Sequence, residues 1–163
     1  MNNKLFETVN ELLEKYIGGQ IFFTELDKAV KFDREMLIEL RHAVHRKYNL
    51  DTIFTIASGE MALALHNFDI EVDFIVPGGL RNDPSKINLE PWAKAINNGK
   101  FVFIDDSYFS GRTVLVIQNE IERLGGKFLG SYVIYDGSKI KEDNVDSLYR
   151  YYDNYDALGQ LIV

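Results

Sequence analysis

Residues 101–113, with the sequence FVFIDDSYFSGRT, constrain the fold of this chain more than any other stretch. Four apolar residues lead into the acidic pair Asp105 and Asp106, and a short loop then ends in Ser-Gly-Arg-Thr, where a helical pattern begins. A continuous apolar run of this kind is typical of a strand buried in a parallel sheet. Where a helix starts directly after such a strand, its backbone N–H groups and its dipole favour an anion. The stretch therefore predicts an anion site beyond a buried strand.

The residue types of this loop suit a phosphorylated sugar. Gly111 lets a phosphate approach the backbone closely. Ser110 and Thr113 offer hydroxyl groups, while Arg112 either adds positive charge or faces solvent. The acidic pair would repel a phosphate, but carboxylates accept hydrogen bonds from sugar hydroxyls and bind Mg²⁺. A ligand that needs hydroxyl acceptors, a phosphate cradle and a metal close together is a phosphorylated ribose.

In this order, the apolar strand, the two acids, the short loop and Ser-Gly-Arg-Thr resemble the phosphoribosyl diphosphate (PRPP) signature of the type I phosphoribosyltransferases (PRTases). The resemblance covers residues 33–136 in layout, where it is nearest to the branch of xanthine phosphoribosyltransferases and purine-operon repressors, but only the PRPP loop is strong in sequence. It implies an α/β fold with a central, mostly parallel sheet flanked by helices and a small hood from the chain ends. It also implies Mg²⁺ as cofactor, PRPP and a nucleobase-like small molecule as ligands, and a place in purine salvage.

The resemblance assigns roles to the residues of the PRPP loop. Asp105 and Asp106 are expected to be catalytic: they would hold the ribose hydroxyls, directly or through Mg²⁺ and water, and stabilise positive charge on the ribose as pyrophosphate leaves. Phe109 stands where some purine enzymes carry an acid, which argues against the hypoxanthine/guanine subtype. The residues expected to bind the 5′-phosphate are Phe109, Ser110, Gly111, Arg112 and Thr113.

A second loop, Ala57-Ser58-Gly59-Glu60, follows an apolar run, and the resemblance makes it the pyrophosphate loop. Gly59 fits a nest of backbone amides around an anion. Glu60 does not fit, because its carboxylate would repel pyrophosphate unless Mg²⁺ intervenes or the side chain points away. The alternative is that Glu60 is an acid at the start of a helix, where it favours the helix dipole.

The turn-rich residues 78–86 occupy the place of the family's mobile catalytic loop. Arg81 and Lys86 are the cations of this stretch, and we expect them to be catalytic by neutralising charge on the departing pyrophosphate. In active members this loop is usually longer, so an ordinary surface loop is the alternative.

Strands that alternate with helices predict an α/β fold with a parallel sheet. Because parallel strands end at the same edge of a sheet, the three loops are expected to converge there. His42 and His45 share one predicted helix, where a solvated pair fits better than a metal site. The expected strands are 52–56, 70–76, 101–104 and 128–135, and the expected helices are 33–48, 61–66, 90–96 and the one that begins at the PRPP loop.

The 163 residues suit a single PRTase-like domain, 1–163, with a core at 33–140 and candidate hood segments at 1–32 and 145–163. A net charge of −7 without a run of Lys and Arg argues against a nucleic-acid partner. The absence of cysteine excludes disulfides and thiolate metal sites. No apolar stretch of membrane length and no signal peptide stand out, so a cytoplasmic protein without a membrane partner is expected. A homodimer is expected by analogy alone.

Two functions stay open. The first is a phosphoribosyltransferase that transfers phosphoribose from PRPP to a nucleobase or similar nitrogen nucleophile and releases pyrophosphate. The second is a non-catalytic PRPP or nucleotide sensor with the same fold, favoured by Glu60 and the short 78–86 loop. A phosphotransfer receiver domain also carries adjacent acids after a strand, but it lacks the Ser-Gly-Arg-Thr cradle. The acceptor base and the pathway do not follow from the sequence.

Overall fold

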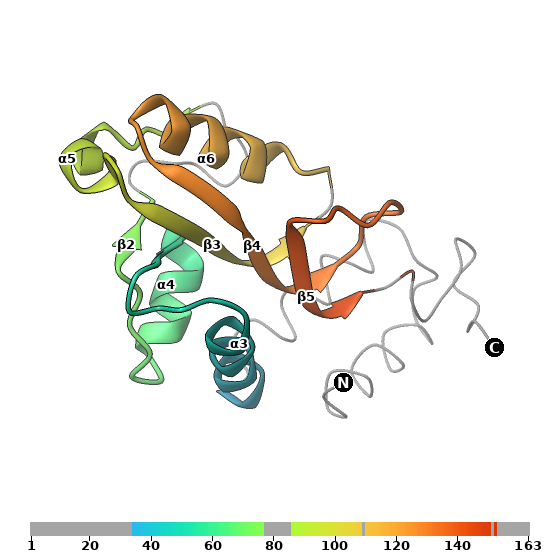
Figure 1. The fold of residues 1–163 in the computed structure, drawn as a ribbon. Helices are drawn as coiled ribbons and strands as arrows, with labels where there is room; N and C mark the ends of the chain where they lie inside the picture. Colours follow the sequence, from blue (N-terminus) through green and yellow to red (C-terminus); the bar gives the residue numbers. More distant parts are fainter. Residues whose placement is uncertain (1–33, 77–85, 109, 151, 153–163) are drawn as a thin grey trace.

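The computed structural model of the protein describes residues 34–76, 86–108, 110–150 and 152. Its core is a sheet of five strands in the order β2-β1-β3-β4-β5, and each neighbouring pair is parallel (Figure 1). The predicted α/β fold with a parallel sheet is therefore confirmed. The strands are β1 (Phe54–Ala57), β2 (Phe74–Ile75), β3 (Lys100–Tyr108), β4 (Lys127–Asp136) and β5 (Val145–Arg150).

Helices cover both faces of this sheet, as Figure 1 shows with α3 and α4 below it and α5 and α6 above it. Alternate residues of β3 enter two separate apolar clusters: Val102 and Ile104 pack with α3 and α4, whereas Phe101 and Phe103 pack with α5 and α6. A strand buried on both faces has to be apolar on both faces, which explains the continuous apolar run. The helices are α3 (Arg34–Lys47), α4 (Gly59–His66), α5 (Ala93–Ile96) and α6 (Arg112–Arg123), with a 3₁₀ turn η2 (Glu90–Trp92) before α5.

The predicted helices of the described region are confirmed. Helix α6 buries Val114, Ile117 and Ile121, the residues that recur at helical spacing. His42 and His45 of α3 are both exposed, and the described residues contain no group of three or more His, Cys, Asp or Glu that could hold a metal ion. None of the helices in the described ranges is both long enough and apolar enough to span a membrane.

Strand β3 continues farther than its apolar run. The prediction that the strand ends at Ile104 is wrong, because parallel pairing with β4 goes on to Tyr108, which lies opposite Asp136. The Tyr108 carbonyl oxygen also accepts a hydrogen bond of 2.9 Å from the Gly137 amide. Asp105 and Asp106 therefore lie within the strand, before the loop.

Strand β2 is shorter than the predicted strand 70–76 and lies at the edge of the sheet. Before it begins, the Asp73 carboxylate accepts hydrogen bonds from the Thr55 amide at 2.8 Å and the Thr55 hydroxyl at 3.0 Å. The Thr55 hydroxyl oxygen accepts in turn from the Asp73 amide at 3.0 Å. Side-chain hydrogen bonds thus replace the backbone ladder, so the strand starts only at Phe74.

Strand β5 was not predicted, although it lies in the segment 145–163 assigned to the candidate hood. Val145, Tyr149 and Arg150 are buried while the residues between them are half-buried, so the strand lacks the strict alternation that a sequence pattern detects. The candidate hood segment 1–32 and residues 153–163 of the other candidate hood segment lie outside the described residues.

Replacing Asp73 with Ala tests the side-chain bridge between the two strands. We expect Asp73→Ala to lower the free energy of unfolding by about 1 kcal/mol, because two donors of Thr55 lose their acceptor while water replaces it only in part. Urea unfolding measures the change. Asp51→Ala is the matched control, since Asp51 is exposed and its carboxylate makes no hydrogen bond with the described part of the chain. Equal stabilities of the two variants would contradict the bridge.

Candidate functional site

The order of strands defines where a ligand would bind. From β1 the chain crosses to β2 on one side and then to β3 on the other, so β1 and β3 are neighbours whose following loops lead in opposite directions. Open α/β sheets bind ligands in the crevice at such a switch point, beyond the carboxyl ends of the strands. The loop after β1 and the loop after β3 are the two loops that the sequence assigns to pyrophosphate and phosphate.

Ser58 joins these two loops. It is the N-cap of α4, where its hydroxyl oxygen accepts a hydrogen bond of 3.3 Å from the Met61 amide. The same hydroxyl donates to Asp105 Oδ1 at 2.9 Å across the switch point. One side chain therefore caps the helix after β1 and orients a carboxylate on β3.

The two acids of β3 have different surroundings. Asp105 is half-buried, and its Oδ1 accepts from the Asp106 amide at 2.9 Å as well as from Ser58. Asp106 is 8% exposed, and the Ser107 hydroxyl lies 3.5 Å from its Oδ1. Successive side chains of a strand point to opposite faces, so the two carboxylates leave β3 on opposite sides. The structure brings Asp105 to the loop after β1 and leaves Asp106 on the other face of the strand.

Gly111 ends the loop after β3 and is the N-cap of α6. Its φ of 78° lies in the left-handed region that glycine adopts readily. No side chain of the N-cap residue bonds the first turn of α6, and the first turn contains no acid. The Ser110 hydroxyl oxygen accepts from the Arg112 amide at 3.4 Å. The N-terminus of α6 thus offers amides and a favourable dipole to an anion.

Tyr108 supports this loop from the end of β3. A Cβ atom at Gly111 would lie only 2.6 Å from the Tyr108 hydroxyl oxygen, so the aromatic side chain packs directly against the glycine. Burial raises the pKa of Tyr108, and the charges of Glu142 and Asp136 raise it further. The Tyr108 side chain therefore supports Gly111 from the side that a Cβ atom would occupy.

The residues of the loop after β1 differ in how accessible they are to a ligand. Ala57 is the last residue of β1 and is fully buried, so only its backbone is available to a ligand. Gly59 is the first residue of α4, and a Cβ atom there would meet nothing within 4 Å. Glu60 is exposed in the first turn of the same helix, which fits the alternative of an acid that favours the helix dipole.

The remaining predicted site residues are Arg81, Lys86 and Phe109. Arg81 and Phe109 lie outside the described residues, and Lys86 is exposed at the end of the turn-rich stretch. The sequence analysis missed Asp136 and Arg150, which are buried at the ends of β4 and β5 beside the candidate site. The sequence signal for Asp136 is an acid directly after a buried apolar run, which is also the signal for Asp105.

The residues at the strand ends suit Mg²⁺ only together with a ligand. Mg²⁺ is usually held by one or two carboxylates, with substrate phosphates and water completing the octahedron. Asp105 is half-buried at the switch point and has the carboxylate chemistry for this role, whereas no cluster of three acids or histidines exists in the described ranges. The donor set fits a metal that arrives with a phosphorylated substrate.

One cavity of the described region lies away from the loops after β1 and β3. It has a volume of about 220 Å³ and is lined by Leu40 and Val44 of α3, Leu65 of α4 and Thr55 of β1, among other residues. None of the residues predicted for the site lines it. This cavity is therefore separate from the described residues of the candidate site.

Comparison with known proteins identifies the fold. No protein-family model and no curated protein matches the sequence. A phosphoribosyltransferase from Corynebacterium diphtheriae has a similar structure with a TM-score of 0.58 and 12% identity, over 93% of this chain and 98% of that one. Orotate phosphoribosyltransferase from Mycobacterium tuberculosis, in complex with inorganic phosphate, has a TM-score of 0.54 and 12% identity, over 94% of this chain and 91% of that one.

These similarities show that the protein has the type I PRTase fold, as the PRPP-like stretch predicted. They extend over almost the full length of both chains. The finer assignment to the xanthine phosphoribosyltransferase and purine-operon-repressor branch is not confirmed by them.

Replacing Gly111 with Ala tests the geometry of the loop. We expect Gly111→Ala to cost about 1–2 kcal/mol of stability for the left-handed backbone alone, with a further loss from the contact with Tyr108. Urea unfolding measures the difference. Gly59→Ala is the matched control, because the space around Gly59 is open and helix α4 accepts alanine there. If Gly111→Ala were as stable as Gly59→Ala, the loop would have another conformation.

Proposed function

We propose that the protein is a phosphoribosyltransferase, which transfers the phosphoribosyl group of PRPP to a nucleobase or similar nitrogen nucleophile and releases pyrophosphate. The observation that carries this proposal is the 2.9 Å hydrogen bond from Ser58 to Asp105. It joins the loop after β1 to the acidic end of β3 at the switch point of a PRTase fold. The orotate phosphoribosyltransferase with this fold was crystallised with inorganic phosphate, which supports a phosphorylated substrate here.

In the proposed complex the 5′-phosphate of PRPP lies at the start of α6. The amides of Ser110, Gly111, Arg112 and Thr113 and the dipole of a helix without an N-cap side chain stabilise it. Phe109 completes this loop as a proposed ligand through its backbone. Because Gly111 has no side chain, the phosphate can approach its backbone from the side that Tyr108 does not cover.

Asp105 and Asp106 act on the ribose. Asp105 already accepts two hydrogen bonds through Oδ1, from Ser58 and from the Asp106 amide, so its orientation is fixed before the substrate binds. A fixed carboxylate next to a ribose that becomes positively charged stabilises that charge without reorganisation. Asp106, buried on the other face of the strand, contributes negative charge at short range in a region poor in water.

Pyrophosphate leaves toward the loop after β1. Backbone amides of Ala57, Ser58, Gly59 and Glu60 at the start of α4 are proposed to receive it, with Arg81 and Lys86 neutralising its charge. Bound Mg²⁺ would supply additional charge neutralisation, and Asp105 and Asp106 are the residues proposed to hold it, directly or through water.

The remaining assignments belong to the same proposal. The chain forms one domain with a core at 33–140, which β5 extends, and the segment 1–32 together with the part of 145–163 that follows β5 is proposed to contribute to a hood over the acceptor base. Purine salvage in the cytoplasm is the proposed setting and a homodimer the proposed assembly.

A sensor that binds PRPP without turning it over is the second candidate. The placement of Glu60 in the first turn of α4 favours it, because a carboxylate there disfavours pyrophosphate. The two functions differ in one measurement. We expect Mg-PRPP to bind in a calorimetric titration and pyrophosphate to be released when a panel of nucleobases is added. Binding without release for every base would select the sensor.

Asparagine substitutions in the acidic pair test the catalytic proposal. We expect Asp106→Asn to lower kcat/KM for PRPP by on the order of 100-fold, because the amide keeps the shape of the side chain and removes its negative charge near the ribose. Asp105→Asn is expected to have a similar effect. Steady-state release of pyrophosphate measures both. The exposed Asp51→Asn serves as control, and wild-type rates for Asp106→Asn would refute its assignment.

A further inference from the structure

A buried ion pair closes two strands next to the candidate site. Asp136 is the last residue of β4 and Arg150 the last residue of β5, and they lie opposite each other in the sheet. Asp136 also lies opposite Tyr108, the last residue of β3. Three neighbouring strands therefore end in a row, with Tyr108 beside the phosphate loop and Arg150 farthest from it.

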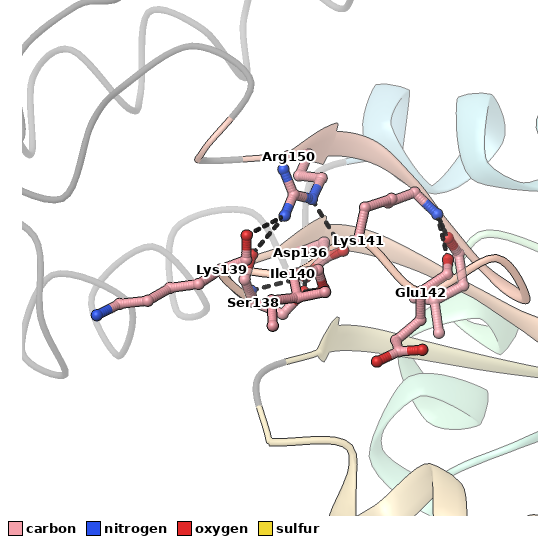
Figure 2. Close-up of polar contacts among 8 residues, drawn as sticks. Asp136, Ser138, Lys139, Ile140, Lys141, Glu142 and Arg150 are labelled. Atoms are coloured by element: carbon pink, nitrogen blue, oxygen red, sulfur yellow. Dashed lines mark hydrogen bonds and ion pairs between the residues drawn. The ribbon is translucent and has the colours of Figure 1, made fainter.

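Arg150 and Asp136 together determine the turn that follows β4 (Figure 2). Asp136 Oδ1 accepts hydrogen bonds from the Ser138 amide at 2.8 Å and the Ser138 hydroxyl at 2.6 Å. Arg150 Nη2 donates to the carbonyl oxygens of Ser138 at 2.7 Å and Lys139 at 3.0 Å. Arg150 Nε lies 3.5 Å from Asp136 Oδ2. The Asp136 carboxylate thus binds hydrogen-bond donors of the turn, and the Arg150 guanidinium binds carbonyl oxygens of the same turn.

The burial of this pair calls for an explanation other than stability. Asp136 is fully buried and Arg150 is 9% exposed. Burying two charges has a desolvation cost that their attraction often fails to exceed, and apolar residues of similar volume frequently stabilise a protein as well. What apolar residues cannot do is donate to two successive carbonyl groups. The two N–H groups of Arg150 Nη2 do this, and because they lie in the rigid guanidinium plane they fix the direction of both peptide groups.

The turn after β4 is also connected to the loop after β3, where the phosphate is proposed to bind. The Gly137 amide donates to the Tyr108 carbonyl oxygen at 2.9 Å, which fixes the last residue of β3. The Tyr108 side chain packs against Gly111, where a Cβ atom would be 2.6 Å from its hydroxyl oxygen. The charge of Glu142, from the same connection between β4 and β5, acts on the Tyr108 phenol and so indicates that this connection lies close to it. A continuous set of contacts leads from Arg150 to Gly111.

We propose that Arg150 is a positioning residue for phosphoribosyl binding: it fixes the turn 137–139, which holds Tyr108 against Gly111 and keeps the start of α6 in its anion-binding conformation. This inference rests on the proposed function and adds a residue that touches neither PRPP nor the acceptor. Under this proposal the buried pair of Asp136 and Arg150 increases the affinity for the phosphorylated substrate, in addition to any contribution to stability.

The substitution Arg150→Lys separates positioning from charge. Lysine keeps a positive charge next to Asp136, but it cannot hold two carbonyl groups in one plane. We expect Arg150→Lys to fold and to bind Mg-PRPP on the order of tenfold more weakly, because a small displacement of the phosphate loop weakens several contacts at once. At saturating PRPP, kcat and KM for the acceptor are expected to stay near the wild-type values.

The control is Arg123→Gln at the opposite end of α6. Arg123 also contacts two acids, Glu120 at 2.9 Å and Glu90 at 2.8 Å, but both contacts lie on the surface. Its loss is expected to leave the affinity for Mg-PRPP unchanged. Amide hydrogen exchange provides a measurement that needs no ligand: Arg150→Lys is expected to speed exchange at 137–139 and also at 111–114, whereas Arg123→Gln leaves 111–114 unchanged.

Each outcome decides between the assignments. Wild-type affinity for Mg-PRPP in a folded Arg150→Lys variant, or unchanged exchange at 111–114, overturns the positioning role and leaves the proposed function intact. A failure of both Arg150→Lys and Arg150→Gln to fold assigns the arginine to stability and also overturns it. A wild-type protein that does not bind Mg-PRPP overturns the proposed function, and the positioning of a PRPP site with it, even if the exchange at 111–114 responds to Arg150→Lys.

Discussion

The central strand β3 is buried on both faces and paired on both edges by parallel neighbours, and the rest of the molecule depends on this constraint. Parallel neighbours require crossover connections, so helices are placed on both faces and every described strand ends at one edge of the sheet. The switch in strand order between β1 and β3 then opens the two loops that carry Ser58 and Gly111. The site is thus a consequence of how one apolar strand is covered.

The same edge carries the polar groups that cannot be left inside the sheet. Asp105 and Asp106 lie near the end of β3, Asp136 ends β4 and Arg150 ends β5, and all of them are at least half-buried. Partial burial requires hydrogen-bond partners, which the neighbouring loops supply through Ser58 for β3 and through Ser138 for β4. Because satisfying one strand end fixes the loop beside it, stability and ligand geometry are coupled at this edge.

The features that depend on local sequence were predictable, and those that depend on pairing between distant segments were not. The apolar run of β3, the buried face of α6 and the glycine at the helix start all appear within a few neighbouring residues. By contrast, β3 continues through its acids because β4 offers partners as far as Asp136, and β2 is shortened because Asp73 meets Thr55. Strand β5 has an irregular burial pattern, and only its pairing with β4 shows that it is a strand. For the candidate site, the sequence predicted that both loops lie at one edge of the sheet, but it could not show that Ser58 reaches Asp105 or that Arg150 binds the turn after β4.

The choice between enzyme and sensor depends on when the polar groups at this edge become ordered. A sensor benefits from a loop that is ordered by its ligand, since the ordering is the signal. A catalyst benefits from groups that are fixed beforehand, because stabilising a developing charge is most effective when no reorganisation is needed. Here Asp105 is oriented by a hydroxyl and an amide, Gly111 is supported by Tyr108, and the turn after β4 is held by a buried arginine, so each is positioned by groups of the protein itself. This preorganisation favours the transferase, since a binding-only protein would gain little from an acid held so firmly at the end of β3.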